Sequence, residues 1–473
     1  MVMQYTPQTF KENSAEALAD DTIRNNFRGA MDFLQAKRAT VLPDKAAFDV
    51  SSKRGEAIKL RCLVKLPELL EKLEDQCKAN GIHVHWAETC EQATQIIDDI
   101  ITAKNGSKVV KGKSMVTEEI GLNDYLAEQN IDCIESDMGE YIVQLGGETP
   151  SHIIMPAIHK NVEQIAELFA ERVPGVEYTT DVNSLIKVGR EQMRQLFLDA
   201  DVGISGVNFA VAETGTLCLV ENEGNGRMTT TIPNTHIALT GIEKVIEHLA
   251  DVPPLLELLT RSATGQLITT YVNMISGPRK VDERDGPEEV HLVLLDNGRS
   301  QAYADEELRK TLACIRCGAC MNACPVYTRI GGHAYGTVYP GPIGKIISPH
   351  LIGLEDSKDL PTASSLCGAC EEVCPVNIPI PSILQRLRVE TNKKSSSAAK
   401  IMRGEGSGRS FIEALGWKGW AFFAVHPALY RMGTWFATRG RKLIPTFNNP
   451  WTVSRSMPKL AAKSLREQLK ERG

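Results

Sequence analysis

Seven of the twelve cysteines gather in two short blocks. The first block has the spacing C-x2-C-x2-C-x3-C-P and the second has the spacing C-x2-C-x3-C-P. Their cysteines are Cys314, Cys317, Cys320 and Cys324 in the first block, and Cys367, Cys370 and Cys374 in the second. In bacterial ferredoxins with the first spacing, three thiolates bind one iron–sulfur cluster, and the cysteine before proline binds the other. The blocks therefore predict electron-transfer chemistry.

The same rule assigns ligands across the two blocks. The first cluster takes Cys314, Cys317, Cys320 and, as its returning fourth ligand, Cys374. The second cluster takes Cys324, Cys367 and Cys370. We expect two iron–sulfur clusters, of which the second lacks one thiolate.

Ser364 occupies the position, three residues before Cys367, where a complete second block would carry cysteine. Three outcomes stay open. The site holds a three-iron cluster, or a four-iron cluster whose odd iron binds Ser364, water or substrate, or a four-iron cluster completed by a thiolate from elsewhere.

Zinc and disulfides are the alternatives to clusters. Structural zinc needs only four ligands, and seven cysteines with two C-P endings exceed that number. Disulfides suit oxidising compartments, whereas the first residues show no basic segment followed by an apolar one, as a secretory signal would. No stretch of eighteen apolar residues lacks charge, so we expect a cytoplasmic protein without a transmembrane span.

The C-terminal part differs from the rest in charge. Residues 391–473 carry 16 Lys and Arg against 4 Asp and Glu, whereas the whole chain has a net charge of −6. Four of the five tryptophans also lie there: Trp417, Trp420, Trp435 and Trp451. This aromatic, basic segment is broken by Pro427, and we expect it to dock on an acidic partner subunit. A membrane interface and packing on the chain itself are the alternatives, and no nucleic-acid module is recognised.

Helical and strand patterns alternate from about residue 65 to 300 after a helical lead-in. Helices are predicted at 67–80, 90–103 and 117–128, and strands at 82–87, 107–110, 131–134 and 152–155. This alternation predicts an α/β domain with a mostly parallel sheet, and ligands in such domains gather at the carboxyl ends of strands.

Two stretches of this domain carry candidate chemistry. Gly112-Lys-Ser114 resembles the end of a nucleotide-binding P-loop, but the upstream glycine is one residue too far away. A turn where Lys111 and Lys113 meet an anion is the weaker interpretation, and a solvated turn is the stronger one. Glu213, before a Thr-Gly turn, is a weak catalytic candidate, and capping of a hairpin is slightly preferred.

Other polar and sulfur-containing residues of this domain look structural. His236 is more often a satisfied structural residue than a base. The remaining cysteines share no ligand spacing and are expected to be small buried hydrophobes: Cys62, Cys77, Cys90, Cys133 and Cys218.

The segments around the cysteine blocks are rich in glycine. Residues 331–344 look too glycine-rich for a helix and are expected to wrap the clusters. Residues 393–408 are typical of a flexible linker.

Five motifs together resemble the lactate utilization protein B family over nearly the whole chain. They are the run from Lys111 to Ile120, the stretch from Ala212 to Thr216, the first cysteine block, the Gly-His-Ala-Tyr-Gly insert, and the stretch from Ser365 to Cys370. The resemblance implies a helical lead-in (1–64), a LUD α/β domain related to CoA-transferase and isomerase sheets (65–300), a helical ferredoxin-like domain (301–390) and a basic C-terminal domain (391–473).

The resemblance also implies a function. Members serve a three-protein system that oxidises L-lactate to pyruvate, with a cysteine-rich partner and a second LUD protein, and they are described with two four-iron clusters. The chain then passes electrons, with catalysis by the LUD domain on a 2-hydroxy acid or CoA substrate as an alternative. Electron transfer for the oxidation of another substrate, such as glycolate or glycerol 3-phosphate, is a further alternative. A role as a scaffold or redox sensor is another.

Overall fold

The computed structural model describes residues 5–392, 411–441 and 459–472. The chain forms two compact units, one that ends at residue 406 and one that begins at residue 407. All twelve cysteines belong to the first unit. That unit therefore holds every predicted cluster ligand.

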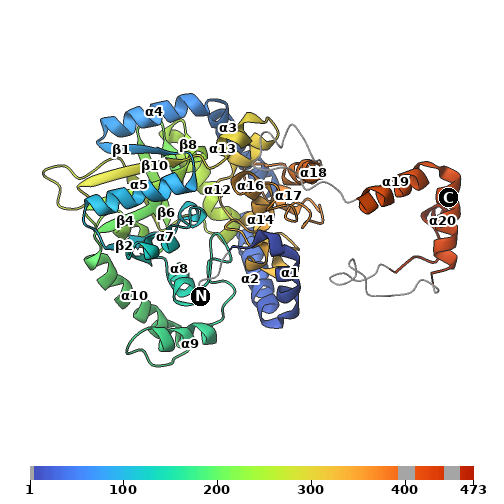
Figure 1. The fold of residues 1–473 in the computed structure, drawn as a ribbon, viewed down its shortest axis with the longest axis horizontal. Helices are drawn as coiled ribbons and strands as arrows, with labels where there is room; N and C mark the ends of the chain where they lie inside the picture. Colours follow the sequence, from blue (N-terminus) through green and yellow to red (C-terminus); the bar gives the residue numbers. More distant parts are fainter. Residues whose placement is uncertain (1–4, 393–410, 442–458, 473) are drawn as a thin grey trace. The chain divides into compact units, whose positions relative to one another are not determined.

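Six parallel strands form the central sheet of the first unit (Figure 1). Their order is β1-β10-β7-β4-β2-β3. The two middle strands β7 and β4 are buried along their whole length, as is typical of parallel strands covered on both faces. The bounds are Ile82–Ala87 (β1), Lys108–Lys111 (β2), Asp132–Glu135 (β3), Val202–Gly206 (β4), Thr235–Gly241 (β7) and Glu289–Leu295 (β10). The predicted mostly parallel sheet is confirmed.

Helices cover both faces of this sheet, because alternate side chains of a strand point to opposite sides. On β10, Leu292 and Leu294 pack in the same apolar core as α4, whereas Val293 and Leu295 pack with α5, α6 and α7. The bounds of these helices are Leu66–Ala79 (α4), Cys90–Ala103 (α5), Met115–Glu119 (α6) and Leu122–Glu128 (α7). The β-α-β alternation of the sequence thus gives a three-layer domain.

Three helices near β2 and β3 form smaller apolar clusters around residues such as Tyr141 and Phe169. They are α8 (Met138–Leu145), α9 (Val162–Arg172) and α10 (Val182–Asp199). A second, four-stranded sheet has the order β8-β5-β6-β9. Its strands and neighbouring helices are β5 (Phe209–Val211), β6 (Thr216–Glu221), α11 (Asn225–Thr229), η2 (Ile242–Lys244), β8 (Val245–Ile246), η3 (Leu249–Asp251), α12 (Val252–Thr264) and β9 (Tyr271–Ile275).

Two local expectations for this domain are wrong. Residues 152–154 lie in a bend and residues 152–155 contain no strand, because the backbone turns around the buried ring of His152. Its Nδ1 accepts hydrogen bonds from the amides of Ile154 and Met155 at 3.0 and 3.2 Å. The single helix expected at 117–128 is two helices, which are separated at Gly121 with φ 63°.

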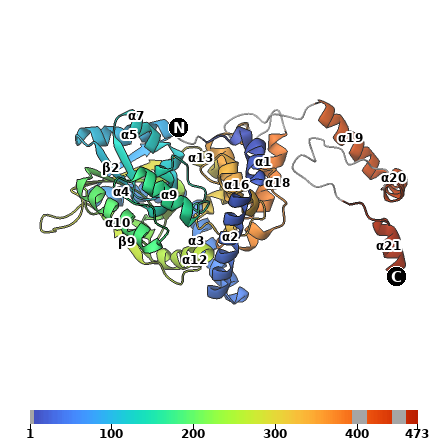
Figure 2. The ribbon, with the colours of Figure 1, turned by 90° about the horizontal axis from the view of Figure 1, so that it is seen from below.

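The helical lead-in packs against the cysteine-rich domain (Figure 2). Its elements are η1 (Pro7–Thr9), α1 (Phe10–Ala19), α2 (Asp21–Val41) and α3 (Lys45–Val64). The ring of Phe27 on α2 meets Tyr327 edge-on at 5.5 Å, and Gln35 donates to the carbonyl of Asn322 at 2.9 Å. The lead-in, the α/β domain and the cysteine domain therefore share one apolar core.

The cysteine domain is built from short helices. They are α13 (Arg299–Ala304), η4 (Leu308–Ala313), α14 (Ala319–Asn322), α15 (Tyr327–Ile330), η5 (His333–Tyr335), α16 (Gly341–Leu351), α17 (Ala369–Glu372) and α18 (Ile380–Thr391). The expectation that residues 331–344 are too glycine-rich for helix is wrong, because η5 and the start of α16 lie there. Gly344 suits this start, since a Cβ atom would collide with the Tyr339 carbonyl oxygen.

The second unit contains α19 (Phe411–Val425), α20 (Pro427–Arg439) and α21 (Leu465–Arg472). Pro427 begins α20, so the predicted break there is confirmed. Trp417, Trp420 and Trp435 are exposed. Trp451 and the linker predicted at 393–408 lie outside the described residues. None of the helices that the structure describes is long and apolar enough to cross a bilayer.

Candidate functional site

Four cysteines from two distant parts of the chain line one apolar cavity. They are Cys314, Cys317, Cys320 and Cys374. Isoleucine side chains complete the wall, among them Ile153 from the α/β domain. Burial, together with the nearby Cys314 and Cys370, raises the pKa of Cys374 to about 12. A bound cluster replaces the thiol proton and shares the negative charge of the sulfur, so the donor set suits iron and sulfide.

The two cysteine loops have the same backbone shape. In the first loop Arg316 has φ 60° and Gly318 has φ 86°, and in the second Leu366 has φ 55° and Gly368 has φ 85°. Each loop runs into a four-residue helix, α14 or α17. The loops are therefore structural repeats, and both carry Gly-Ala between the cysteines that flank the glycine, Cys317 and Cys320 in the first loop and Cys367 and Cys370 in the second.

The repeat places Ser364 where the first loop has Cys314. The amide of Arg316 donates to Cys314 Sγ at 3.3 Å, and the amide of Leu366 donates to Ser364 Oγ at 3.2 Å. Ser364 thus has the backbone environment of a cluster ligand, with oxygen in place of sulfur.

The remaining three cysteines of the blocks form a second group. Burial raises the pKa of Cys370 to about 11, and its charged neighbours include Cys324, Lys345 and Cys367. Cys367 is exposed, whereas Cys324 and Cys370 are buried. The buried ammonium of Lys345 lies 4.0 Å from Cys324 Sγ. The second group therefore lies at the surface on one side and against a buried cation on the other.

Buried ion pairs join the first cysteine loop to the α/β domain. Glu243, just after β7, binds Arg299 at 2.6 Å and Arg316 at 3.0 Å. Although burial opposes ionisation, these two guanidinium groups hold the pKa of Glu243 at about 2. Arg299 also pairs with Glu119 at 2.8 Å. This network fixes the loop between Cys314 and Cys317 on the end of the sheet.

A larger cavity of about 270 Å³ separates the sheet from the first cysteine loop. Its walls include residues that follow four parallel strands: Lys113 and Ser114 (β2), Asp137 (β3), Asn208 (β4) and Lys244 (β7). The cysteine domain contributes Arg316, Cys317 and Tyr339. The cavity therefore lies at the carboxyl ends of the strands, as expected for ligand sites in parallel sheets.

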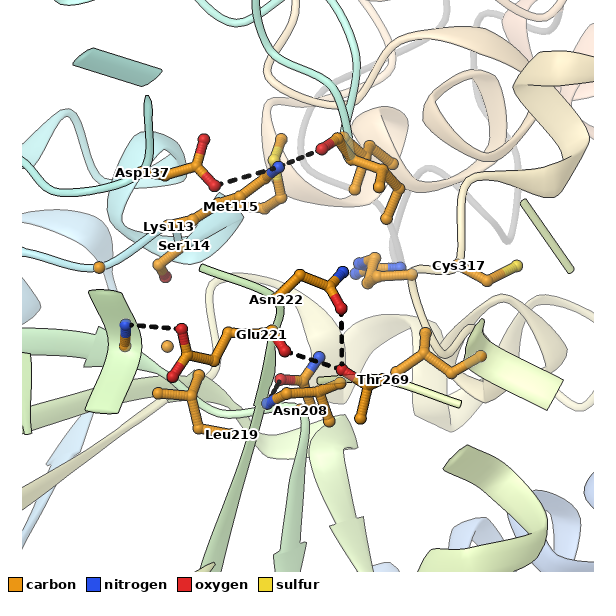
Figure 3. Close-up of a pocket in the computed structure, with 18 of the residues that line it drawn as sticks. Lys113, Ser114, Met115, Asp137, Asn208, Leu219, Glu221, Asn222, Thr269 and Cys317 are labelled. Carbon is orange, nitrogen blue, oxygen red and sulfur yellow. Dashed lines mark hydrogen bonds and ion pairs between the residues drawn. The ribbon is translucent and has the colours of Figure 1, made fainter. Parts of the chain in front are cut away.

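Most polar groups around this cavity also fix its loops (Figure 3). Lys113 donates to the carbonyl oxygen of Ile154 and pairs with Asp137 at 4.0 Å. On the facing wall, Glu221 accepts from the amide of Gly226 at 3.1 Å, and Asn222 accepts from the hydroxyl of Thr269 at 3.4 Å. The shape of the cavity is thus held by the chain itself.

The candidate residues of the α/β domain prove to be mainly structural. Lys111 is fully buried and pairs with Glu118 and Glu135, so it is not available to an anion, whereas Lys113 reaches the cavity. Glu213 caps the β5–β6 hairpin region, where it accepts from the Leu249 amide at 2.9 Å. It does not line the cavity, which adjoins the opposite end of β6.

His236 and the five scattered cysteines also take structural places. His236 is buried on β7 and shares a hydrogen bond of 2.8 Å with Ser205. Four of the five cysteines outside the blocks are buried and Cys90 is half-buried.

Sequence reasoning missed Glu243, Lys244 and Arg316. Burial, together with repulsion from Arg316, lowers the pKa of Lys244 to about 7. Arg316 stands between two predicted ligands, and that position was a usable signal. Nothing in the local sequence marks Glu243 or Lys244, because only the fold brings the end of β7 to the cysteine loop.

Comparison with known families divides the chain into three matched regions. The LUD domain matches residues 70–295, the 4Fe-4S dicluster domain matches residues 310–378, and the family "Lactate utilisation protein B, C-terminal" matches residues 386–473. The dicluster match covers all seven cysteines of the two blocks. The predicted fold class is thus confirmed, and so is the presence of an iron–sulfur domain.

Three curated relatives match nearly the whole chain. Lactate utilization protein B of Bacillus licheniformis is 42% identical over 443 residues, which are 93% of this chain and 90% of that protein. Its namesake from Bacillus subtilis (strain 168) is 40% identical over 460 residues, 97% of this chain and 92% of that one. The uncharacterized electron transport protein YkgF of Escherichia coli (strain K12) is 41% identical over 471 residues, 98% and 96% of the two chains. The chain belongs to the lactate utilization protein B family.

Proposed function

We propose that this chain is an iron–sulfur electron-transfer subunit of a system that oxidises L-lactate to pyruvate. The names of its relatives refer to lactate utilization and to electron transport. The observation that carries the proposal is the cavity lined by four thiols from two sequence blocks. Such a cavity suits a cluster, and clusters supply carriers of single electrons.

In this proposal the cysteines divide into two ligand sets. Cys314, Cys317, Cys320 and Cys374 bind the first [4Fe-4S] cluster, and Cys324, Cys367 and Cys370 bind the second. Amide groups of the chain support the sulfur atoms, since Ile378 donates to Cys374 at 3.4 Å and Tyr327 donates to Cys324 at 3.5 Å. Hydrogen bonds of this kind favour the reduced, more negative state of a bound cluster.

Ser364 is the proposed fourth ligand of the second cluster. Its Oγ accepts the same loop hydrogen bond that the Cys314 sulfur accepts. A three-iron cluster, or a ligand from outside the chain, would leave Ser364 with its present hydrogen bond alone. Iron counting distinguishes these cases.

The burial of the two groups gives the proposed direction of electron flow. Cys317 of the first group lines the large cavity, whereas Cys367 of the second group is exposed. Electrons would enter beside the cavity and leave at the exposed loop. The receiver there is one of the partners expected from the family, a cysteine-rich subunit or a second LUD protein.

The C-terminal unit is the proposed docking element. Exposed Trp417, Trp420 and Trp435 lie on helices α19 and α20, within a segment rich in basic residues. Aromatic side chains with Arg and Lys suit an acidic protein surface. In this proposal the chain is cytoplasmic, and contact with the inner face of a membrane is the competing use of the same surface.

The decisive experiment follows the oxidation state of the clusters in the complete chain. The protein is purified without oxygen, mixed with the two partner proteins, and given L-lactate while cluster absorbance is recorded. The proposal expects bleaching by L-lactate, and none by glycolate or glycerol 3-phosphate. No bleaching with any partner combination, although the oxidised clusters are present, would exclude service to lactate oxidation.

Catalysis by the α/β domain is the second candidate function. It is favoured by the position of the large cavity, which adjoins both the strand ends and Cys317. Bleaching of the chain by lactate without any partner would support this candidate over the first.

A further inference from the structure

Two cationic side chains line the large cavity with donor groups that the protein leaves unused. Lys244 is 6% exposed, and within the described ranges no hydrogen bond or ion pair engages its amino group. Arg316 is 7% exposed. Its Nη2 binds Glu243, whereas its Nη1 is buried and has no hydrogen-bond partner among the described residues. A buried donor without a partner costs free energy, so Arg316 Nη1 indicates a missing acceptor, and the unengaged amino group of Lys244 belongs to a residue that lines the same cavity.

Charge in this region is also unbalanced. Four buried cations surround the first cysteine loop: Lys59, Lys244, Arg299 and Arg316. Two buried carboxylates, those of Glu119 and Glu243, form the ion pairs with Arg299 and Arg316 described above. The region therefore has room for added negative charge.

An oxidised four-iron cluster with its four thiolates would carry about two negative charges and so balance this surplus, but the two unpaired cations lie differently toward it. Arg316 lines both the thiol cavity and the large cavity. Lys244 lines only the large cavity. Lys244 thus points to an anion in the large cavity, beside Cys317.

The opposite end of the cavity selects against extra negative charge. Asp137 and Glu223 line both this cavity and an adjoining surface groove. Lys113 is the cation paired with Asp137 there. Burial raises the pKa of Glu223, and repulsion from Asp137 adds to it, so this end disfavours a further carboxylate. A ligand with one anionic end and a neutral polar end suits both walls.

The volume limits the ligand further. About 270 Å³ is below the usual range for drug-sized ligands, and it suits an organic acid of a few carbon atoms. The planar fork of Arg316 favours carboxylate geometry.

We propose that the large cavity binds a small organic monocarboxylate, whose carboxylate group lies between Lys244 Nζ and Arg316 Nη1. The acid then lies beside Cys317, which the proposed function makes a ligand of the first cluster. The inference deepens that function, since it gives the electron-transfer subunit its own acid-binding site.

The test is calorimetric titration of the anaerobically purified full-length chain, with iron and sulfide counted in the same sample. The probes are L-lactate, its neutral isostere lactamide, the dicarboxylate L-malate, and inorganic phosphate. We expect saturable binding of L-lactate, and binding of the other three that is at least about tenfold weaker, because the site requires one carboxylate. No saturable binding of L-lactate, or preference for phosphate or malate, would overturn the proposal.

Two lysine variants locate the site. We expect Lys244→Met to weaken L-lactate binding roughly 10- to 100-fold, because a charge-assisted hydrogen bond is lost. The matched control is Lys187→Met on α10, whose amino group pairs only loosely with Glu191 at 3.8 Å. Equal weakening in both, or in neither, would contradict the assignment. Loss of iron from Lys244→Met would also overturn it, since Lys244 would then serve the cluster.

Spectroscopy and iron content keep the two proposals apart. We expect L-lactate to change the paramagnetic resonance signal of the reduced first cluster in the natural chain, and to leave it unchanged in Lys244→Met. Full iron content without acid binding would refute the cavity site and leave the electron-transfer function intact. Binding of the acid to a chain that assembles no cluster would refute the electron-transfer function and leave the cavity site intact.

Discussion

The two cysteine loops have one backbone shape but two environments. Both place a non-glycine residue and a glycine at positive φ before a four-residue helix. The first loop is buried, supplies three of the four thiols around its cavity and is held by an ion pair with Glu243. The second has Ser364 at its first position and an exposed cysteine at 367. The repeat shows that one backbone geometry is placed in two surroundings that differ in burial and in charge.

The largest effect should separate equivalent cysteines of the two loops. Cys317→Ser removes a buried ligand of the first group, so we expect loss of about half of the iron and severe destabilisation of the shared core. Cys367→Ser changes an exposed ligand, so the loss should be confined to the second cluster. Iron per chain and thermal unfolding measure both, with Cys90→Ser as a control. Equal destabilisation by both substitutions would contradict the comparison.

Ion pairs beside the two loops should differ nearly as much. Glu243→Gln leaves Arg299 and Arg316 buried without a full partner, which should cost about 3–5 kcal/mol in the free energy of unfolding. Glu372→Gln, on α17 of the second loop, breaks only an exposed pair with Lys45 at 3.2 Å. Its cost should stay below about 1 kcal/mol. Denaturant titration measures both values, and similar costs would show that the first loop gains nothing from burial.

Acid should reduce the effect of Glu243→Gln. The pKa of Glu243 in the folded chain is about 2, below its value in the unfolded chain. Its stabilising contribution is therefore complete above about pH 4.5 and is lost as the pH falls toward 2. The unfolding free energies of the natural chain and the variant should converge over that window. A constant difference would mean that the glutamate acts through packing and not through charge.

A smaller effect is expected when the second loop is made like the first. Ser364→Cys places a thiol where Cys314 stands in the first loop, so iron should be retained longer in air. Ser364→Ala removes the oxygen, and we expect about one iron fewer per chain. Counts of iron and sulfide after timed exposure to air distinguish the variants. Identical retention in all three chains would show that residue 364 is not a ligand position.

The smallest effect concerns the buried cation of the second group. Lys345→Met removes a positive charge 4.0 Å from Cys324 Sγ, so the more negative reduced state loses support. The reduction potential of the second cluster should fall while that of the first stays unchanged. A redox titration followed by paramagnetic resonance reads both potentials. A matching fall in the first would mean that Lys345 acts on both groups.

The sequence predicted the parts of the fold that depend on local pattern. The alternation between helices and strands predicted the parallel sheet, and four of the seven cysteines that the spacing singled out line one cavity. The bend at His152 escaped prediction, because a buried ring and not a turn residue shapes it. The glycine content predicted no helix at the start of α16, but Gly344 permits close packing inside that helix.

The cavity could not be predicted from the sequence for a different reason. Lys244 and Arg316 are 72 positions apart in the sequence and meet only after β7 ends beside the cysteine loop. Glu213 was a catalytic candidate because it follows a strand, but that strand belongs to the second sheet. Residue type and position relative to a strand thus identify candidates, and the order of strands decides which of them converge.

The most direct test of the central claim is paramagnetic resonance of the anaerobic chain before and after dithionite, with iron counted in the same sample. Two four-iron clusters predict about eight irons, no signal in the oxidised protein, and two interacting signals after reduction. About seven irons with a signal already present in the oxidised protein would contradict the four-iron assignment of the second group. Zinc in place of iron would contradict electron transfer by either loop.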